Sequence, residues 1–365
     1  MKLDSLRGRL AARRDEIRSL AIGVLAGGSS NERAISLISG RAVVKALQDA
    51  GYNAQLLSVA KDNLTLELET PSRAAKDQRL STGGGKLATA GAEQGSTAIV
   101  TALRRMQVVV TTMHGTLGED GVWQGLLELL GVPYVSAGVK GSALAMDKLT
   151  SKRLFAQLDI PTPEYWVYEP GASCRADVPA SITELVAKPV AEGSSVGIAM
   201  VSNDDTGWTK IEGLAVEHGR MLVEKRIYGR ELTAGVIGHS SEPVALPLVE
   251  IKPKEREFYD YTAKYTQGET GYECPADLAA ILTERIQGHA ETIFREFELG
   301  PYARVDCLLD DEGTPWFLEA NTLPGFTPLS LLPQAAKAAG ISFTELVELV
   351  MLIALERTEG QGGGR

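Results

Sequence analysis

The stretch ARVDCLLDDEGTPWFLEAN, residues 303–321, decides the fold of the C-terminal part of this chain. Two apolar runs in it flank the polar segment DDEG. Apolar runs around an Asp/Gly turn are typical of a β-hairpin. A loop of two or four residues would pair position 304 with 319 and position 306 with 317. The sequence therefore predicts a hairpin in that register.

Charged and amide side chains gather on one face of this predicted hairpin. Side chains alternate between faces along a strand, so Arg304, Asp306, Glu319 and Asn321 should point the same way. Two carboxylates and an amide oxygen suit Mg²⁺, which prefers oxygen ligands. An arginine beside them suits a negatively charged group or transition state. Taken alone, a solvated face with ordinary salt bridges explains these residues equally well.

Length and composition bound the class of protein. A chain of 365 residues predicts two or three domains. The net charge of −10, without a stripe dense in Lys and Arg, argues against a nucleic-acid partner. Three widely spaced cysteines fit a reducing compartment. No apolar run has the length of a membrane span and no signal peptide is recognisable, so we expect a cytoplasmic protein without membrane insertion.

Short apolar runs alternate with helical patterns from about residue 20. The runs are LAIGVLAGG, AQLLSVA, MQVVVTTMHG and VPYVSAG. This β-α alternation predicts an α/β domain with a parallel sheet, whose ligands gather at the carboxyl ends of the strands. A helical stretch over 143–155 then leads into a small α+β unit at about 163–228. Strands, a helix at about 276–298, the hairpin and a last helix, SFTELVELVMLIALERT, complete the pattern.

Three segments are expected to lie outside the core. Residues 1–19 read as an exposed helix with a short stripe of Leu3, Leu6 and Leu10. Segment 82–96 is rich in Gly, Ala and Ser and predicts a flexible surface loop. The tail 356–365 is expected to be disordered.

Two motifs could bind a nucleotide. The segment LVAKPVAEGSSVGIAMV is strand, glycine- and serine-rich loop, then strand; such a loop presents N–H groups to phosphates, and Lys188 can add charge. It is not a P-loop, and a plain hairpin turn explains it as well. In MLVEKRIYGRE, Glu224 and Lys225 end a strand in a layout that suits purine edge contacts, or an ordinary strand end.

Other candidates each have a structural explanation too. Glu32 lies near a helix start, where a carboxylate is favoured anyway, and His114 follows a strand at the end where α/β sites form. Lys148 lies on a helical stretch, where most lysines are solvated. The aromatic segment FYDYTAKY lies in a long polar loop of the kind that forms lids. After Asn321, the turn at Pro324-Gly325 and a helix start at Ser330 could bind an anion.

Together these motifs resemble one family. The order AGGSSNER, HGTLGEDG, MDKLTSK, KPVAEGSSVG, VEKRIYGRE, FYDYTAKY, RVDCLLDDEG and LEANTLPGFTPLSLLP is similar to that of the D-alanine–D-alanine ligases of the ATP-grasp superfamily. The resemblance covers about residues 20–352. It implies an N-terminal parallel-sheet α/β domain, 20–142, followed by a two-subdomain ATP-grasp fold. The small ATP-binding subdomain would be 143–228 and the catalytic subdomain 229–355.

The resemblance also implies roles for individual residues. The implied ATP site consists of Lys148, Lys188, Glu192, Gly193, Ser194, Ser195, Glu224, Lys225, Ile227, Glu231 and Lys264. Two Mg²⁺ or Mn²⁺ ions would be bound by Asp306, Glu319 and Asn321. Amino-acid substrates would be bound by Glu32, His114, Lys264, Arg304, Ser330 and Leu331. The implied catalytic groups are Glu32, Ser194, Tyr265, Arg304 and Gly325. At Arg226 the family often has an aromatic residue, which puts adenine stacking in doubt.

The implied reaction joins two D-alanines for peptidoglycan precursor synthesis, with ATP consumed through an acylphosphate. A homodimer through the N-terminal domain is also implied. The alternatives are a sister ligase that makes D-alanyl-D-lactate or D-alanyl-D-serine, a ligase for L-amino acids, and a nucleotide-binding protein without activity. The presence of Tyr265 favours D-alanine as second substrate, because in this family that tyrosine accompanies dipeptide formation.

Overall fold

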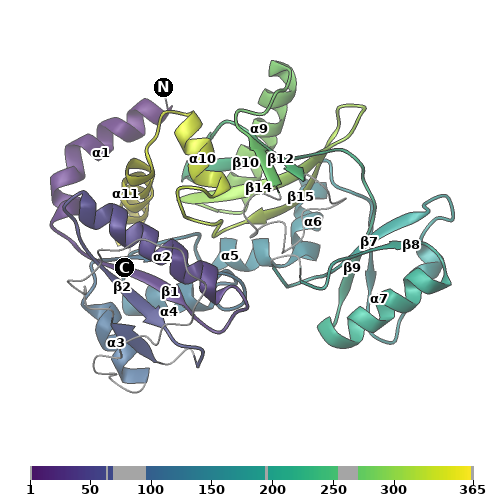
Figure 1. Cartoon of the computed structure of the whole chain (residues 1–365), viewed down its shortest axis with the longest axis horizontal. Coiled ribbons are helices and arrows are strands. Elements are labelled where there is room, and N and C mark those ends of the chain that lie inside the picture. The colour runs from purple at the N-terminus through teal and green to yellow at the C-terminus, as the bar shows by residue number, and fades with distance from the viewer. Residues whose placement is uncertain (1, 63–64, 69–95, 194–195, 254–269, 363–365) are drawn as a thin grey trace.

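The computed structural model describes most of the chain, and its uncertain segments are drawn in grey in Figure 1. The described residues are 2–62, 65–68, 96–193, 196–253 and 270–362. Several predictions fall outside them: residues 82–95 of the predicted loop 82–96, Ser194, Ser195, Lys264, Tyr265 and the last three residues of the tail.

The N-terminal part is the predicted parallel sheet with helices. Its strand order is β3-β2-β1-β4-β5, and the four strands other than β3 run parallel. The elements are β1 (Ala21–Gly27), α2 (Arg33–Asp49), β2 (Asn53–Val59), β3 (Leu66–Leu68), α3 (Ser96–Arg104), β4 (Val108–Thr111), α4 (Val122–Leu130) and β5 (Tyr134–Val135). The central strands β1 and β4 are almost wholly buried, as a sheet covered on both faces requires.

Two helices follow where one helical stretch was predicted. They are α5 (Val139–Met146) and α6 (Lys148–Gln157), and the chain breaks between them at Asp147, which is extended. The Asp147 carboxylate accepts a hydrogen bond from the Thr150 N–H at 2.7 Å and so caps α6. This cap makes Lys148 the first residue of α6 and points its side chain toward the centre of the molecule.

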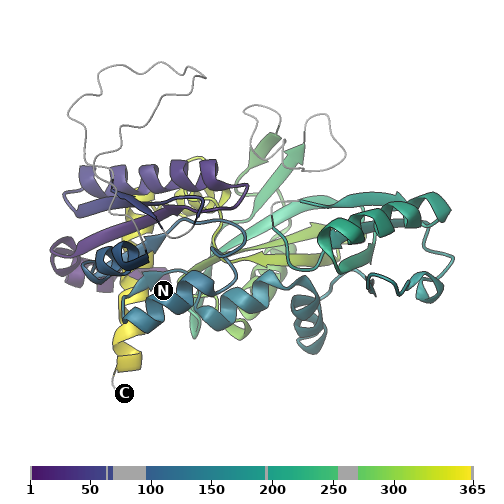
Figure 2. The same ribbon diagram turned by 90° about the horizontal axis from the view of Figure 1, so that it is seen from below.

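A small antiparallel sheet, β6-β9-β7-β8, forms one end of the molecule, and α7 covers one of its faces (Figures 1 and 2). Its elements are β6 (Tyr165–Tyr168), a 3₁₀ turn (Arg175–Asp177), β7 (Glu184–Pro189), β8 (Ala199–Ser202), α7 (Asp205–His218) and β9 (Met221–Lys225). Trp208 and Ile211 of α7 pack with Leu185 and Val223 in a separate core. The predicted α+β unit is therefore confirmed.

The third sheet lies between the other two and has the order β13-β12-β10-β14-β15, with β11 paired to β10. Its elements are β10 (Arg230–His239), β11 (Glu242–Ala245), β12 (Val249–Pro253), β13 (Thr270–Glu273), α9 (Ala280–Glu296), β14 (Tyr302–Leu309), β15 (Pro315–Asn321), α10 (Leu331–Ala338) and α11 (Phe343–Gly362). Phe155 of α6 stacks on Phe297 just after α9, which ties α6 to the core of this sheet.

The hairpin β14–β15 forms, but its predicted register is wrong. Asp306 pairs with Glu319 and Arg304 pairs with Asn321. The prediction had placed 306 opposite 317 and 304 opposite 319. The difference amounts to two residues along β15.

A longer loop and a β-bulge explain this register. The loop closes through the Asp310 side chain, which accepts hydrogen bonds from two loop N–H groups. The pairing then shifts between Asp306 and Cys307, because Cys307 pairs with Phe317 and leaves Leu318 as the extra residue. The loop and the bulge together place Glu319 opposite Asp306. The four predicted side chains therefore still share one face.

The N-terminal helix is not the exposed helix that the sequence predicted. Helix α1 (Lys2–Arg18) lies alongside α11 (Figure 1) and buries Leu6, Leu10 and Ile17 completely or nearly so. Four ion pairs join the two helices: Arg7–Glu345, Arg9–Glu356, Arg13–Glu359 and Arg14–Glu348. The sequence prediction underestimated the apolar face of this helix, because Ile17, which is also buried, lies about two turns beyond Leu10.

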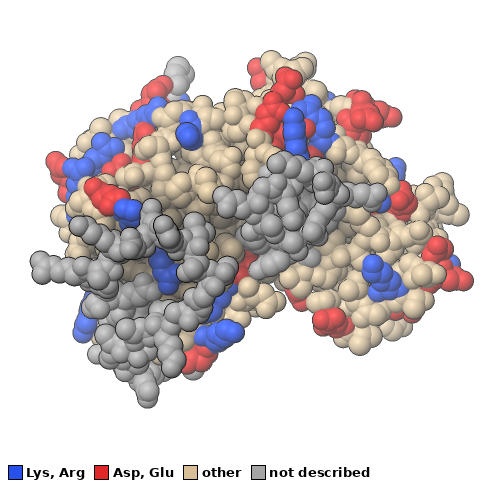
Figure 3. All heavy atoms as spheres, in the orientation of Figure 1, with Lys and Arg blue, Asp and Glu red and all other residues tan. Residues whose placement is uncertain are grey.

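The predicted disordered tail is also partly wrong. Residues 356–362 continue α11, and Glu356 and Glu359 bind arginines of α1. Among the described residues, no single helix is long and apolar enough to cross a membrane; only α10 and α11 taken together meet that criterion, and they meet at 102°. On the face in Figure 3, basic and acidic side chains are interspersed, without a patch of one sign.

Candidate active site

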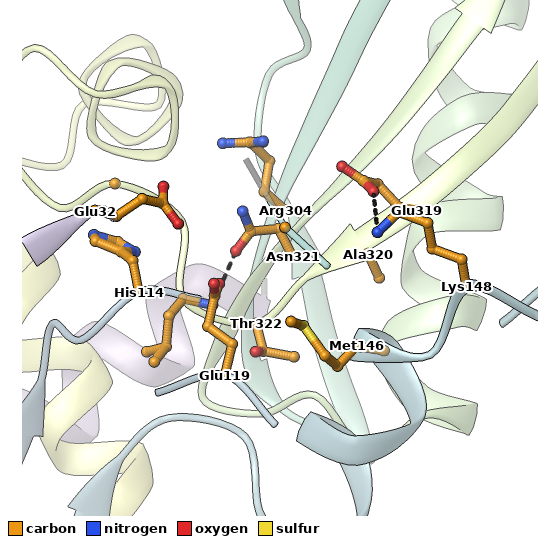
Figure 4. A pocket seen from close by; sticks show the side chains of 14 residues that line it. Glu32, His114, Glu119, Met146, Lys148, Arg304, Glu319, Ala320, Asn321 and Thr322 are labelled. Atoms are coloured by element: carbon orange, nitrogen blue, oxygen red, sulfur yellow. Dashed lines mark hydrogen bonds and ion pairs between the residues drawn. The ribbon is translucent and has the colours of Figure 1, made fainter. Parts of the chain in front are cut away.

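A cavity of about 90 Å³ lies where the N-terminal sheet, α5–α6 and the hairpin meet (Figure 4). It is bounded by both charged and apolar groups. Its lining consists of Glu32, His114, Glu119, Ala145, Met146, Lys148, Gly193, Arg304, Glu319, Ala320, Asn321, Thr322, Leu323 and Gly325. Eight of these residues were predicted from the sequence: Glu32, His114, Lys148, Gly193, Arg304, Glu319, Asn321 and Gly325. The fold therefore brings together motifs that are almost 300 residues apart.

Glu32 and His114 form one wall of the cavity. Glu32 is the N-cap residue of α2, but its side chain makes no capping hydrogen bond. It is 7% exposed, and its Oε2 lies close to Gly115 of the turn that follows β4. Burial lowers the pKa of His114 despite the nearby Glu32 carboxylate, so the imidazole is neutral. Among the described residues, the buried His114 Nε2 has no hydrogen-bond partner.

Glu119 is a site residue that the sequence reasoning missed. It belongs to the same HGTLGEDG motif as His114, and the Gly115 N–H donates to its Oε2 at 2.6 Å. Burial and the neighbouring Glu32 carboxylate raise the pKa of Glu119 to about 8. Asp120 holds the turn in shape, because it accepts hydrogen bonds from the N–H groups of Leu117 and Val122.

The position of Glu119 could have been noticed in the sequence. A carboxylate five residues after His114, in a turn at the carboxyl end of a parallel strand, lies where α/β sites form. The Glu32 carboxylate, beside a neutral imidazole, makes this end of the cavity negative, and Glu119 adds a second negative charge when it loses its proton. Such an end suits a cationic group, for example an ammonium.

Arg304 lines another side of the cavity, and Asp306 lies behind it as its ion-pair partner. The Arg304 guanidinium donates to both oxygens of Asp306, at 2.9 and 2.8 Å, and the Thr233 hydroxyl donates to Asp306 Oδ1 at 2.5 Å. The Asn321 amide oxygen accepts from the Leu323 N–H at 3.0 Å. These contacts lock the charged face of the hairpin in one geometry, with Arg304 on the cavity side.

The hairpin residues fit a hard divalent cation. Asp306 and Glu319 are direct cross-strand partners, so their carboxylates extend from adjacent points on one face, and Asn321 adds an amide oxygen. Within the described residues there is no group of three or more His, Cys, Asp or Glu arranged to bind a metal. A cation here would therefore depend on the amide oxygen or on substrate oxygens to complete its ligands.

A second, smaller cavity adjoins the first. It encloses about 20 Å³ and is lined by Lys148, Lys188, Pro189, Glu192, Gly193, Val196, Ile198 and Glu319. Lys148 and Glu319 line both cavities, and their charged groups lie 3.6 Å apart. The Lys148 ammonium also donates to the Glu192 carbonyl at 2.5 Å. Burial lowers the pKa of Lys148, and the Glu319 carboxylate opposes that effect.

Lys188 and Glu224 meet beside this second cavity. Both side chains are buried, and the Lys188 ammonium lies 2.6 Å from Glu224 Oε2. Burial raises the pKa of Glu224, but Lys152 and Lys188 lower it by more, so the carboxylate is ionised. Lys148 and Lys188 line this pocket together with Gly193 and Val196, and two lysines in one pocket suit an anion such as a polyphosphate.

The turn after the hairpin completes the first cavity. Ser330 is the N-cap residue and Leu331 the first residue of α10, as predicted. A Cβ at Gly325 would lie 3.0 Å from the Ser330 hydroxyl, so the turn packs closely against the helix start. The N–H groups at the start of α10 are thereby brought beside the cavity that Gly325 lines.

Other predicted site residues lie apart from both cavities. Lys225 is the last residue of β9, Ile227 is on the connection to β10 and Glu231 is in β10; none of them lines either cavity. Their predicted nucleotide contacts stay predictions. Four further predictions, for Ser194, Ser195, Lys264 and Tyr265, fall in segments that the structure does not describe.

Two protein-family models match the chain. Residues 21–137 match the model described as D-ala D-ala ligase N-terminus, and residues 154–352 match D-ala D-ala ligase C-terminus. A D-alanine–D-alanine ligase of Geobacter sulfurreducens is 37% identical, over 96% of this chain and 99% of its own length. A D-alanine–D-alanine ligase of Desulforudis audaxviator is 39% identical, over 92% of this chain and 99% of its own length.

Solved structures of D-alanine ligases have the same fold as this chain. The D-alanine–D-alanine ligase of Bacillus anthracis in complex with ATP superposes with a TM-score of 0.72 at 28% identity, over 93% of this chain and 98% of its own. The VanG D-Ala:D-Ser ligase of Enterococcus faecalis gives 0.72 at 26% identity, over 91% and 98%. With both halves of the family matched, and relatives well above 30% identity over nearly the full length, the chain is a member of the D-alanine–D-alanine ligase family.

Proposed function

We propose that this chain joins two D-alanines into D-alanyl-D-alanine, with ATP converted to ADP and phosphate, for peptidoglycan precursor synthesis. Membership of the family supports an ATP-dependent ligase. The observation that carries the proposal is the pair of adjoining cavities. One has a negative end beside a neutral histidine, the other has buried lysines, and Lys148 and Glu319 lie between them.

The first D-alanine occupies the larger cavity. Its ammonium lies between Glu32 and Glu119, whose ionised form it favours, and the His114 Nε2, which has no partner within the described part of the chain, is available to it. Its carboxylate then points toward Lys148 and the second cavity. One carboxylate oxygen attacks the γ-phosphorus of ATP, the bond to the β-phosphate oxygen breaks, and ADP leaves. The product is an acylphosphate.

ATP occupies the second cavity and the region beside Glu224. Lys148 and Lys188 place positive charge against the transferred phosphoryl group, where their burial strengthens the interaction. We assign the adenine and ribose contacts to Glu224, Lys225, Ile227 and Glu231. Mg²⁺ or Mn²⁺ bound by Asp306, Glu319 and Asn321 would neutralise charge on the phosphates and organise them for in-line transfer.

The second D-alanine attacks the acyl carbon with its neutral amine. The tetrahedral intermediate carries an oxyanion, which Arg304 and the Gly325 N–H stabilise. Phosphate leaves as the peptide bond forms. The carboxylate of this second substrate binds Ser330, the Leu331 N–H and Lys264. We assign to Glu32, Ser194 and Tyr265 the exclusion of water from the acylphosphate.

Isotope transfer tests this mechanism. D-Alanine labelled with ¹⁸O in its carboxylate should deliver one labelled oxygen to the released phosphate, because the attacking oxygen stays on phosphorus. Phosphate without label, formed together with dipeptide, would contradict an acylphosphate. A control with labelled L-alanine should release no phosphate.

A sister ligase for D-lactate or D-serine is the second candidate, because a D-Ala:D-Ser ligase has the same fold. Tyr265 favours D-alanine, because in this family the tyrosine accompanies dipeptide formation.

We further propose a cytoplasmic homodimer. Its interface would involve the exposed apolar side chains Val122 and Leu129 of α4, with Val139 beside them on α5. Sedimentation equilibrium tests the dimer, and a monomer at micromolar concentration would contradict it.

A further inference from the structure

Lys152 is a buried lysine for which the sequence motifs suggested no role. It lies on α6, four residues and about one turn after Lys148, and its side chain is 0% exposed. A lysine is almost never fully buried unless it is paired. Lys148 and Lys152 therefore present two ammonium groups from one helix to the space between the small sheet and the hairpin sheet.

The ammonium of Lys152 makes two contacts. It forms an ion pair with Glu224 Oε1 at the end of β9, and it donates to the Thr162 hydroxyl at 2.5 Å. That hydroxyl donates onward to the Phe317 carbonyl at 2.7 Å. Phe317 is the last residue of β15 before the bulge that sets the position of Glu319. The chain of contacts therefore joins β9, α6 and the hairpin.

Glu224 is shared between two lysines. Its Oε1 faces Lys152, and its Oε2 lies 2.6 Å from Lys188. The cluster has two positive charges and one negative charge, all buried. The cluster therefore has one positive charge more than is required to neutralise the carboxylate. If Lys188 turned to a phosphate group, the pair of Glu224 and Lys152 would remain neutral. Without Lys152, the same movement would leave a buried carboxylate uncompensated, which is strongly unfavourable.

We propose that Lys152 is a positioning residue that keeps the Glu224 carboxylate in place and ionised, so that Lys188 can leave it for the phosphates of ATP. This inference rests on the proposed ATP site. An ionised carboxylate can only accept hydrogen bonds, so a fixed Glu224 selects a purine with an amino group at C6 over one with an oxygen there. Lys152 thus contributes both to ATP affinity and to the choice of base, without touching the nucleotide.

The test measures nucleotide binding directly, apart from catalysis. Calorimetry with the β,γ-imido analogues of ATP and of inosine triphosphate gives both affinity and base preference. Lys152→Met should weaken binding of the ATP analogue on the order of 100-fold and reduce the preference for adenine over hypoxanthine. Arg153→Met, an exposed neighbour on the same helix, is the matched control and should change neither quantity.

A double variant shows whether Lys152 acts through Glu224. On a Glu224→Gln background no buried carboxylate remains, so adding Lys152→Met should change affinity by less than about threefold. A further tenfold loss would overturn the proposal, as would an unchanged adenine preference in Lys152→Met. If Lys152→Met alone does not fold, the affinities of Glu224→Gln and of the double variant are compared instead, because neither protein contains an unpaired buried carboxylate. A difference of less than about threefold between them supports the proposal, and a tenfold loss in the double variant overturns it.

The wild-type protein separates this inference from the proposed function. Wild-type protein that binds the ATP analogue but forms no dipeptide would refute the ligase activity and leave the Lys152 comparison readable. Wild-type protein that does not bind the analogue would overturn both.

Discussion

Glu119 provides the sharpest prediction about the first amino-acid site. Its pKa is raised to about 8 by burial and by Glu32, so in the empty site most molecules carry a proton there at neutral pH. An ammonium bound between the two carboxylates favours the ionised form. Binding of the first D-alanine therefore expels this proton, and affinity should rise as the pH approaches and passes the pKa.

The magnitude follows from the ionised fraction. With a pKa of about 8, that fraction rises from about 0.03 at pH 6.5 to about 0.76 at pH 8.5, which corresponds to a gain of about 25-fold. The Glu119 side chain lines the cavity and keeps partial exposure, which weakens the shift, so we expect about tenfold.

The assay compares wild type with Glu119→Gln at pH 6.5, 7.5 and 8.5, with the KM of the first D-alanine as readout. The wild-type KM should fall about tenfold over this range, relative to the variant. Other ionisations, including that of the amine of the second D-alanine, occur in both proteins and cancel in the ratio. Parallel pH profiles in the two proteins would refute the assignment of Glu119 to the ammonium site.

Three further predictions concern the metal face, the helix α1 and the lid. Glu319→Gln should lower kcat about 100-fold or more, because it removes a metal carboxylate; near-normal turnover would contradict the metal assignment. Leu10→Ala should lower the free energy of unfolding in urea by about 3 kcal/mol, against about 1 kcal/mol for the half-buried Leu3→Ala; equal costs would show that α1 does not pack as described. Tyr265→Phe should raise the KM of the second D-alanine more than that of ATP in steady-state assays; the reverse order would mean the loop is misassigned.

Local patterns predicted much of the fold. The parallel N-terminal sheet follows from near-continuous apolar strands separated by helices, and the α+β unit follows from its alternating segments. The hairpin residues 304, 306, 319 and 321 could be placed on one face because period-two alternation is robust. Their register could not be predicted, because the five-residue loop and the bulge at Leu318 each shift the pairing by one residue, and neither has a strong sequence signal.

Long-range contacts were the part that the sequence could not supply. The burial of α1 depends on α11, more than 300 residues away, and the arginines that suggested an exposed helix find their glutamates there. Glu119 and Lys152 were missed for a similar reason. In each case the prediction from sequence assigned a role to a nearby residue of the same motif, His114 or Lys148. The roles proposed for Glu119 and Lys152 depend on their spatial partners, which the sequence does not show.

The most direct test of the central claim is phosphate release from ATP and Mg²⁺ with D-alanine, L-alanine, or D-alanine plus D-lactate, with product masses recorded alongside. We expect phosphate and D-alanyl-D-alanine with D-alanine alone, no release with L-alanine, and no ester product when D-lactate is added at neutral pH. Phosphate release that requires D-lactate would assign the second site to a hydroxy acid. No release with any of the three would contradict the ligase activity itself.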